Sequence, residues 1–211
     1  MGGMGNHIAI RKSLARRGDL YAEATDVPVW TDLQGNISQG TGNAALTYEA
    51  YRDTNFKLYF LRYSQADELN FVFQMPHEWD PTTDIRPHLH FIPMADPAAP
   101  QIFALALLYS WSHVGAALPA NVNWVAKSVT KTINPGDVYK ELVIPFGSIV
   151  PPTGAKESDL LLIQMKRDTT PDTYETGKTG GTAAANVAVL SCDVHYRKVK
   201  LGTAAEFPRT P

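Results

Sequence analysis

Residues 68–76 read ELNFVFQMP, a stretch in which two sets of side chains alternate along the chain. Leu69, Phe71, Phe73 and Met75 fall on one side, and Asn70, Val72 and Gln74 fall on the other. Successive side chains of a β-strand point to opposite faces of its sheet, so a period of two is typical of a strand with one buried face. The stretch therefore predicts a β-strand that packs one face on a core.

The same period recurs along most of the chain after Trp30. In QIFALALLYSW, residues 101–111, both sets of side chains are apolar, which predicts a strand covered on both faces. Further candidates, rich in β-branched and aromatic residues, are NFKLYFLRY (55–63), YKELVIPF (139–146), DLLLIQMKR (159–167) and VAVLSCDVHYRKVKL (187–201). Segments rich in Pro and Gly separate them, and no helical stripe follows residue 20. We expect an all-β protein, a two-sheet β-sandwich that is jelly-roll-like.

The chain shows no internal repeat and no linker, so we expect one sandwich domain over residues 28–200. It is flanked by a basic arm, residues 1–27, and a tail, residues 201–211. The arm, extended or forming a short helix, carries four predicted partner-binding residues: Arg11, Lys12, Arg16 and Arg17. Either it is a solvated, partly disordered terminus or it orders on a neighbouring subunit. The polar loop 168–181 is long for a hairpin, as is typical of an interface or a mobile segment.

Composition excludes several classes of protein. A net charge of −2 over 211 residues gives no general attraction to nucleic acid or to an anionic membrane. The single cysteine, Cys192, cannot form an intrachain disulfide. The first residues lack the apolar segment of a secretory signal, and the longest apolar run falls short of the ~20 residues that cross a bilayer. We expect a soluble protein made in a reducing compartment, with no nucleic-acid or membrane partner.

Three of the six histidines lie within QMPHEWDPTTDIRPHLHFIP, residues 74–93. On a strand, His88 and His90 would share one face, and Asp193 and His195 repeat that spacing on a strand that could be adjacent. Four such ligands would suit zinc or another divalent transition metal. Cupins also place HxH on a strand but add a glutamate shortly afterwards, whereas the first acid after His90 here is Asp96.

We favour an architectural role for this group of histidines. Pro76 and Pro87 restrict the backbone before His77 and His88, which suits side chains that fix a turn, and a neutral imidazole can bridge two polar groups. The predicted structural residues are His77, His88, His90 and His195. A structural ion at His88, His90, Asp193 and His195 remains the alternative.

No known catalytic motif identifies an enzyme. The chain contains no G-x-S-x-G elbow, P-loop or H-E-x-x-H sequence, and Cys192 is expected to be a buried, inert thiol. We therefore predict no catalytic residue and no cofactor. A carbohydrate-binding protein or a cupin-like metal-dependent enzyme is the alternative from another class, because paired carboxylates and sugar-binding aromatics leave no sequence signature.

Five blocks, in order, resemble a family of tailed-bacteriophage virion proteins. They are VPVWTDL, FQMPHEWDPTTDIRPHLHFIP, ALLYSW, LLIQMKRDTTPDTYETG and LSCDVHYRK, spread over roughly residues 28–198. The QMPH…PHLH block is the most specific of the five. Two positions depart from the family pattern: Phe91 stands where Trp is usual, and Arg197 stands where an acid is usual.

The resemblance implies a non-enzymatic virion structural protein with a β-sandwich fold. We expect a homo-trimeric capsid decoration or cement subunit, made in the cytoplasm of the bacterial host and assembled into the virion. Its expected partners are itself and other virion proteins such as the major capsid protein. A tail, collar or fibre-base subunit is the alternative within the same class.

Overall fold

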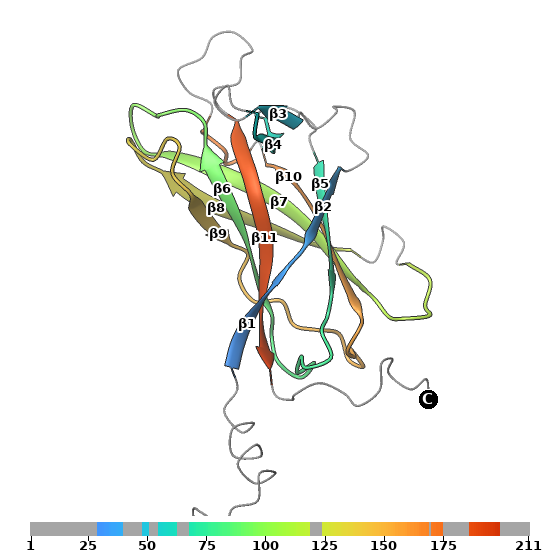
Figure 1. Cartoon of the computed structure of the whole chain (residues 1–211). Coiled ribbons are helices and arrows are strands. Elements are labelled where there is room, and N and C mark those ends of the chain that lie inside the picture. Colours follow the sequence, from blue (N-terminus) through green and yellow to red (C-terminus); the bar gives the residue numbers. More distant parts are fainter. Residues whose placement is uncertain are drawn as a thin grey trace, which may run out of the picture.

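The computed structural model describes residues 29–39, 48–50, 55–62, 68–118, 124–168, 170–174 and 186–198. These residues form eleven β-strands and no helix, in two antiparallel sheets (Figure 1). The prediction of an all-β, two-sheet, jelly-roll-like sandwich is confirmed. The arm, with Arg11, Lys12, Arg16 and Arg17, and the tail lie outside the described residues. Within the described part of the chain, no helix has the length and apolar character needed to cross a membrane.

The strands are divided almost equally between the sheets. The first sheet runs β3 (Tyr48–Ala50), β4 (Lys57–Leu61), β11 (Val187–Lys198), β6 (Arg86–Pro93) and β9 (Leu142–Pro145), with β1 (Val29–Gln34) also pairing with β11. The second runs β2 (Asn36–Gln39), β5 (Glu68–Gln74), β10 (Leu160–Arg167), β7 (Gln101–Ser112) and β8 (Val125–Ile133). At the centre of each sheet, two strands that are far apart in the sequence pair with each other. These are β6 with β11 in the first sheet and β5 with β10 in the second.

The chain passes from the first sheet to the second at Gly35. β1 pairs with β11 and β2 pairs with β5, so the two strands form one nearly continuous ribbon across the sandwich (Figure 1). The amide N of Gly35 donates to the carbonyl of Cys192 at 3.0 Å. A Cβ at this position would lie 2.5 Å from Cζ of Phe73, a core ring, so only glycine lets the backbone pass here without displacing it.

The core consists of the inward faces of both sheets. Leu69, Phe71, Phe73 and Met75 are at most 1% exposed, as their alternation in the sequence predicts. Phe91 of β6 contacts Phe103 of β7 across the sandwich, with ring centroids 4.8 Å apart. One continuous cluster of buried residues contains all of these side chains.

One expectation about the strands needs correction, and the sequence did not reveal every strand. The prediction that both faces of residues 101–111 are covered is only partly right: Ala104 is buried, but Leu108, on the same outer face, is 37% exposed. The structure also contains β8, which the sequence analysis did not identify. β8 is an edge strand that pairs with β7 alone, and its alternating side chains are mostly polar, including Lys127 and Lys131. Charged side chains on an edge strand discourage pairing with another chain, and they also hide the apolar pattern of a strand.

Candidate functional site

A group of polar side chains lies on the outer face of the first sheet. Leu89 and Phe91 of β6 point into the core, so His88 and His90 point outward. The antiparallel register places Asp193 of β11 opposite His88. We call His88, His90 and Asp193 the β6–β11 cluster; one ligand atom of each lies within 4.8 Å of the others.

A bulge in β11 brings Asp193 to this face. Val187 and Val189 point into the core, and so do Cys192 and Val194, a spacing of three residues in the middle of a strand of period two. The register shift between Val189 and Ser191 accounts for the extra residue. Without the shift, Asp193 would point into the apolar core.

Within the cluster, the Asp193 carboxylate is the common neighbour of both imidazoles. Its Oδ2 lies 3.4 Å from Nε2 of His90 and 4.0 Å from Nε2 of His88. Asp193 is only 8% exposed, and its buried Oδ1 has no hydrogen-bond partner. Buried carboxylate oxygens are normally hydrogen-bonded, so this atom is an exception that requires an explanation.

The second nitrogen of His90 is already occupied. Nδ1 of His90 lies 2.6 Å from Oε1 of Glu141, a carboxylate that can only accept, so Nδ1 carries the proton of that bond. In the neutral ring, Nε2 then has a free lone pair directed toward Asp193. This arrangement holds the orientation of the His90 ring.

His195 lies beside the cluster but directs its nitrogen elsewhere. Its Nε2 lies 2.7 Å from Oδ1 of Asp32, its register partner on β1, while its ring centroid is 4.5 Å from that of His88. The structure therefore brings together three of the four residues considered as ligands, and it pairs the fourth with an acid that the sequence did not single out. The separation of Asp32 and His195 along the chain gives no signal of this pair.

Burial lowers the pKa of His88 from its ordinary value of 6.5, and the neighbouring rings of His195 and His90 act in the same direction. A hydrogen bond to the backbone of Arg86 and the charge of Asp193 oppose this shift in the His88 pKa. The lowered pKa of His88 favours the neutral imidazole, the form that can accept a hydrogen bond or bind a metal.

An open pocket of about 690 Å³ covers the cluster. Its lining includes Asp32, Arg86, His88, His90, Asp193 and His195. The guanidinium of Arg86 stacks over the ring of Trp30, 4.6 Å from its centroid, and Trp30 is 43% exposed. The outer face of the first sheet is thus accessible and carries both charge and an aromatic surface.

The remaining predicted residues lie elsewhere. His77 follows β5, and its Nε2 lies 2.9 Å from the hydroxyl of Ser158, just before β10 begins. His77 thereby joins two connections at one end of the sandwich. Cys192 is fully buried, and that burial raises the pKa of its thiol well above the ordinary value, so the thiolate needed for reactivity is disfavoured.

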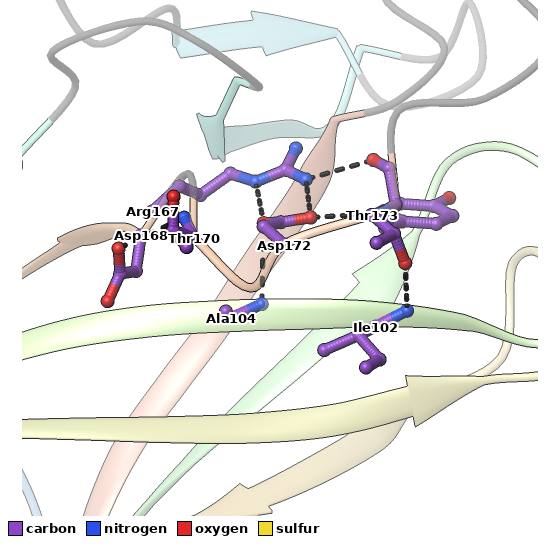
Figure 2. A network of polar contacts seen from close by, with 8 residues as sticks. Ile102, Ala104, Arg167, Asp168, Thr170, Asp172 and Thr173 are labelled. Atoms are coloured by element: carbon purple, nitrogen blue, oxygen red, sulfur yellow. Dashed lines mark hydrogen bonds and ion pairs between the residues drawn. The ribbon is translucent and has the colours of Figure 1, made fainter.

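A buried ion pair that the sequence did not reveal joins the last residue of β10 to the loop that follows. The guanidinium of Arg167 donates to the carboxylate of Asp172 from Nε at 2.9 Å and from Nη2 at 2.8 Å (Figure 2). The same carboxylate accepts from the amide N of Ala104, and Thr173 Oγ1 accepts from the amide N of Ile102. The first part of the polar loop is therefore fixed to β7. An Arg and an Asp five residues apart give no signal of such a pair.

A second missed pair lies near the opposite end of β7. Nδ1 of His113 lies 2.7 Å from Oδ2 of Asp159, and that buried oxygen also accepts from the amide N of Lys156. His113 itself is exposed and lines an open pocket with Trp111 and Pro152, so this pair orders a turn at the surface.

No protein-family model matches the chain, and no curated protein matches its sequence. Among solved structures, the CBM22-2 xylan-binding domain of Paenibacillus barcinonensis Xyn10C aligns at 12% identity and a TM-score of 0.40, covering 79% of this chain and 98% of that domain. The xylan-binding module CBM15 aligns at 11% identity and a TM-score of 0.38, covering 81% of this chain and 97% of that module. The enzymatically active domain of bacteriophage CBA120 tailspike protein 4 aligns at 13% identity and a TM-score of 0.32, covering 78% of this chain and 19% of that one. Alignments at these values assign neither a family nor a function.

Proposed function

We propose that this protein is a non-enzymatic structural component of a tailed-bacteriophage virion, a trimeric decoration or cement subunit on the capsid. The proposal combines the resemblance of the five sequence blocks to virion proteins with the use that the fold makes of those blocks. A tail, collar or fibre-base subunit is the alternative position on the particle.

One observation carries the proposal: the block with the most specific resemblance serves to close the sandwich. Trp79, in the middle of QMPHEWDPTTD, is 1% exposed and stacks on Trp111 of β7, with centroids 5.6 Å apart and planes 7° apart. Trp79 also forms a β-bridge with Lys198 at the end of β11. The block therefore joins a connection to strands of both sheets, as expected for residues that give a shell or tail subunit its rigidity.

The proposal is tested by locating the protein on purified particles of the phage that encodes it. Antibodies against the recombinant protein are applied to intact virions and visualised by immunogold electron microscopy. Regular labelling of the capsid is the expected result. Labelling confined to the tail or neck would move the subunit to the alternative position, and particles without the protein would overturn the virion role.

Trimer formation is tested separately, by light scattering coupled to size exclusion. We expect about three times the chain mass of 23.2 kDa, because edge strands of a sandwich are commonly covered by association through cyclic symmetry. A variant that lacks residues 1–17 should still fold but bind particles more weakly, if the basic arm docks on a neighbouring subunit. The difference from the full-length protein should shrink as salt rises, because salt screens the attraction that the arm supplies. A protein that stays monomeric at micromolar concentration would contradict the trimer. Unchanged binding of the shortened variant to particles would contradict docking of the arm.

Carbohydrate binding is a second candidate, favoured by the open pocket and the exposed Trp30–Arg86 stack beside it. An aromatic surface flanked by polar side chains is typical of a sugar-binding face. Affinity electrophoresis against a panel of polysaccharides tests this, with Trp30→Ala as the variant and Phe56→Ala, another exposed aromatic, as the control. Retardation that Trp30→Ala abolishes and Phe56→Ala leaves intact would establish it.

A further inference from the structure

We propose that the β6–β11 cluster, His88, His90 and Asp193, binds one divalent transition-metal ion, with zinc the best match. The three ligands come from neighbouring strands at the centre of the first sheet, where the hydrogen-bonded ladder fixes their positions. The site goes beyond the virion role proposed above and does not depend on it, since the ion would bind within one chain.

The donor set selects the class of ion. Two imidazoles and one carboxylate suit zinc and its neighbours, whereas Mg²⁺ and Ca²⁺ prefer shells made of oxygen. Zinc sites with three protein ligands leave a fourth position for water or another molecule. Here that position would face the open pocket above the sheet.

An ion would have to draw the cluster together, since its three ligand atoms lie within 4.8 Å of one another. Zinc bonds of about 2.0–2.1 Å at tetrahedral angles place ligand atoms about 3.3 Å apart. Nε2 of His90 and Oδ2 of Asp193 are already 3.4 Å apart, and Nε2 of His88 lies 4.0 Å from the same oxygen. Binding would therefore draw the ring of His88 toward Asp193.

The unpartnered Oδ1 of Asp193 is independent evidence for a ligand. Asp193 is only 8% exposed, yet no donor among the described residues reaches this oxygen. A buried carboxylate without a counter-charge or donor is costly. A cation held by both carboxylate oxygens of Asp193 would supply the missing partner.

The contact between His90 and Glu141 prepares His90 as a ligand. Because Nδ1 is held by Oε1 of Glu141 at 2.6 Å, a neutral His90 ring would direct the lone pair of Nε2 toward Oδ2 of Asp193. Two acceptors facing each other repel unless a proton or a metal lies between them. Metal-bound histidines are commonly oriented by a carboxylate on the other ring nitrogen. His195 is not a ligand here, because its Nε2 lies on Asp32.

The test is calorimetric titration of the chelator-stripped, full-length protein with ZnCl₂, and with MgCl₂ for comparison. We expect one zinc per chain and no comparable binding of magnesium. Asp193→Asn, which keeps the side-chain shape, and His90→Gln should each weaken zinc binding by more than about 100-fold, since even outer-shell changes cost roughly 10–100-fold. Glu141→Gln should fall within that outer-shell range. His113→Ala is the matched control, because it removes a histidine that contacts a carboxylate, Asp159, outside the cluster.

Folding of each variant is checked by circular dichroism before titration. Zinc should raise the melting temperature of the wild type and of His113→Ala, but not that of Asp193→Asn. Cobalt(II) in place of zinc should give the visible absorption of a four-coordinate site. The proposal would be overturned if the folded wild type bound no zinc. It would also be overturned if Asp193→Asn and His90→Gln bound zinc as tightly as the wild type does.

Discussion

Removing the carboxylate of Asp172 should destabilise the sandwich more than any surface substitution. Asp172 and Arg167 are each 4% exposed, and two hydrogen bonds of 2.8 and 2.9 Å join them (Figure 2). In Asp172→Ala, the buried guanidinium would lose both hydrogen bonds to this carboxylate, while the carbonyl of Tyr174 at 2.9 Å would still accept from it. Breaking a buried pair from one side costs roughly 3–5 kcal/mol. That is a large part of the roughly 5–15 kcal/mol by which domains are stable.

Urea unfolding followed by tryptophan fluorescence measures this loss. With a denaturant slope of about 2–3 kcal/mol/M, the midpoint should fall by roughly 1–2 M. Asp168→Ala is the matched control: Asp168 lies in the same loop and accepts from the Ser128 hydroxyl at 2.6 Å, but no described cation pairs with it at short range. Its loss should stay near the roughly 1 kcal/mol of an ordinary hydrogen bond.

A double variant, Arg167→Met with Asp172→Leu, separates the buried charge from the packing. Replacing both partners of a buried pair by apolar residues is often close to neutral, so the double variant should be more stable than Asp172→Ala. The reasoning fails if Asp172→Ala shifts the midpoint no further than Asp168→Ala. It also fails if the double variant is less stable than the single one.

Three other substitutions test the fold and the cluster. Gly35→Ala should lower stability by roughly 1–3 kcal/mol in urea unfolding, because its Cβ would overlap the ring of Phe73, and a wild-type midpoint would contradict that overlap. Tyr174→Phe should cost roughly 1–3 kcal/mol by the same measurement, since the hydroxyl both donates to the carbonyl of Ala95 at 2.7 Å and accepts from its amide at 2.9 Å. In chelator, the melting temperature should fall as the pH drops below about 6.5, because the unfolded chain binds a proton at His88 that the folded chain, with its lowered His88 pKa, resists. His88→Asn should flatten this slope, and an unchanged slope would assign it to other groups.

The sequence by itself determined the fold class and most of the longer strands, whereas the short strands β1, β2 and β3 were not predicted. In residues 68–76, each side chain's face follows from its position in the chain, because the period of two is a local property of extended backbone. The same rule placed His88 and His90 on one face. It failed at β8, where polar side chains on an edge strand carry no contrast between a buried and an exposed face.

The tertiary structure decided which residues meet. Asp193 is about a hundred residues from His88 and faces it only because the β6–β11 register is shifted between Val189 and Ser191. A bulge of one residue exchanges the two faces of the strand beyond it, and no local pattern states that Cys192 rather than Asp193 is the buried residue. The burial of the Arg167–Asp172 pair likewise depends on β7, because Asp172 accepts a hydrogen bond from the amide N of Ala104 on that strand. The periodicity of the chain decides which face of a sheet each side chain lies on, because it is a property of the local backbone. Pairing between distant strands decides which side chains are adjacent, and the candidate site consists of side chains from two such strands.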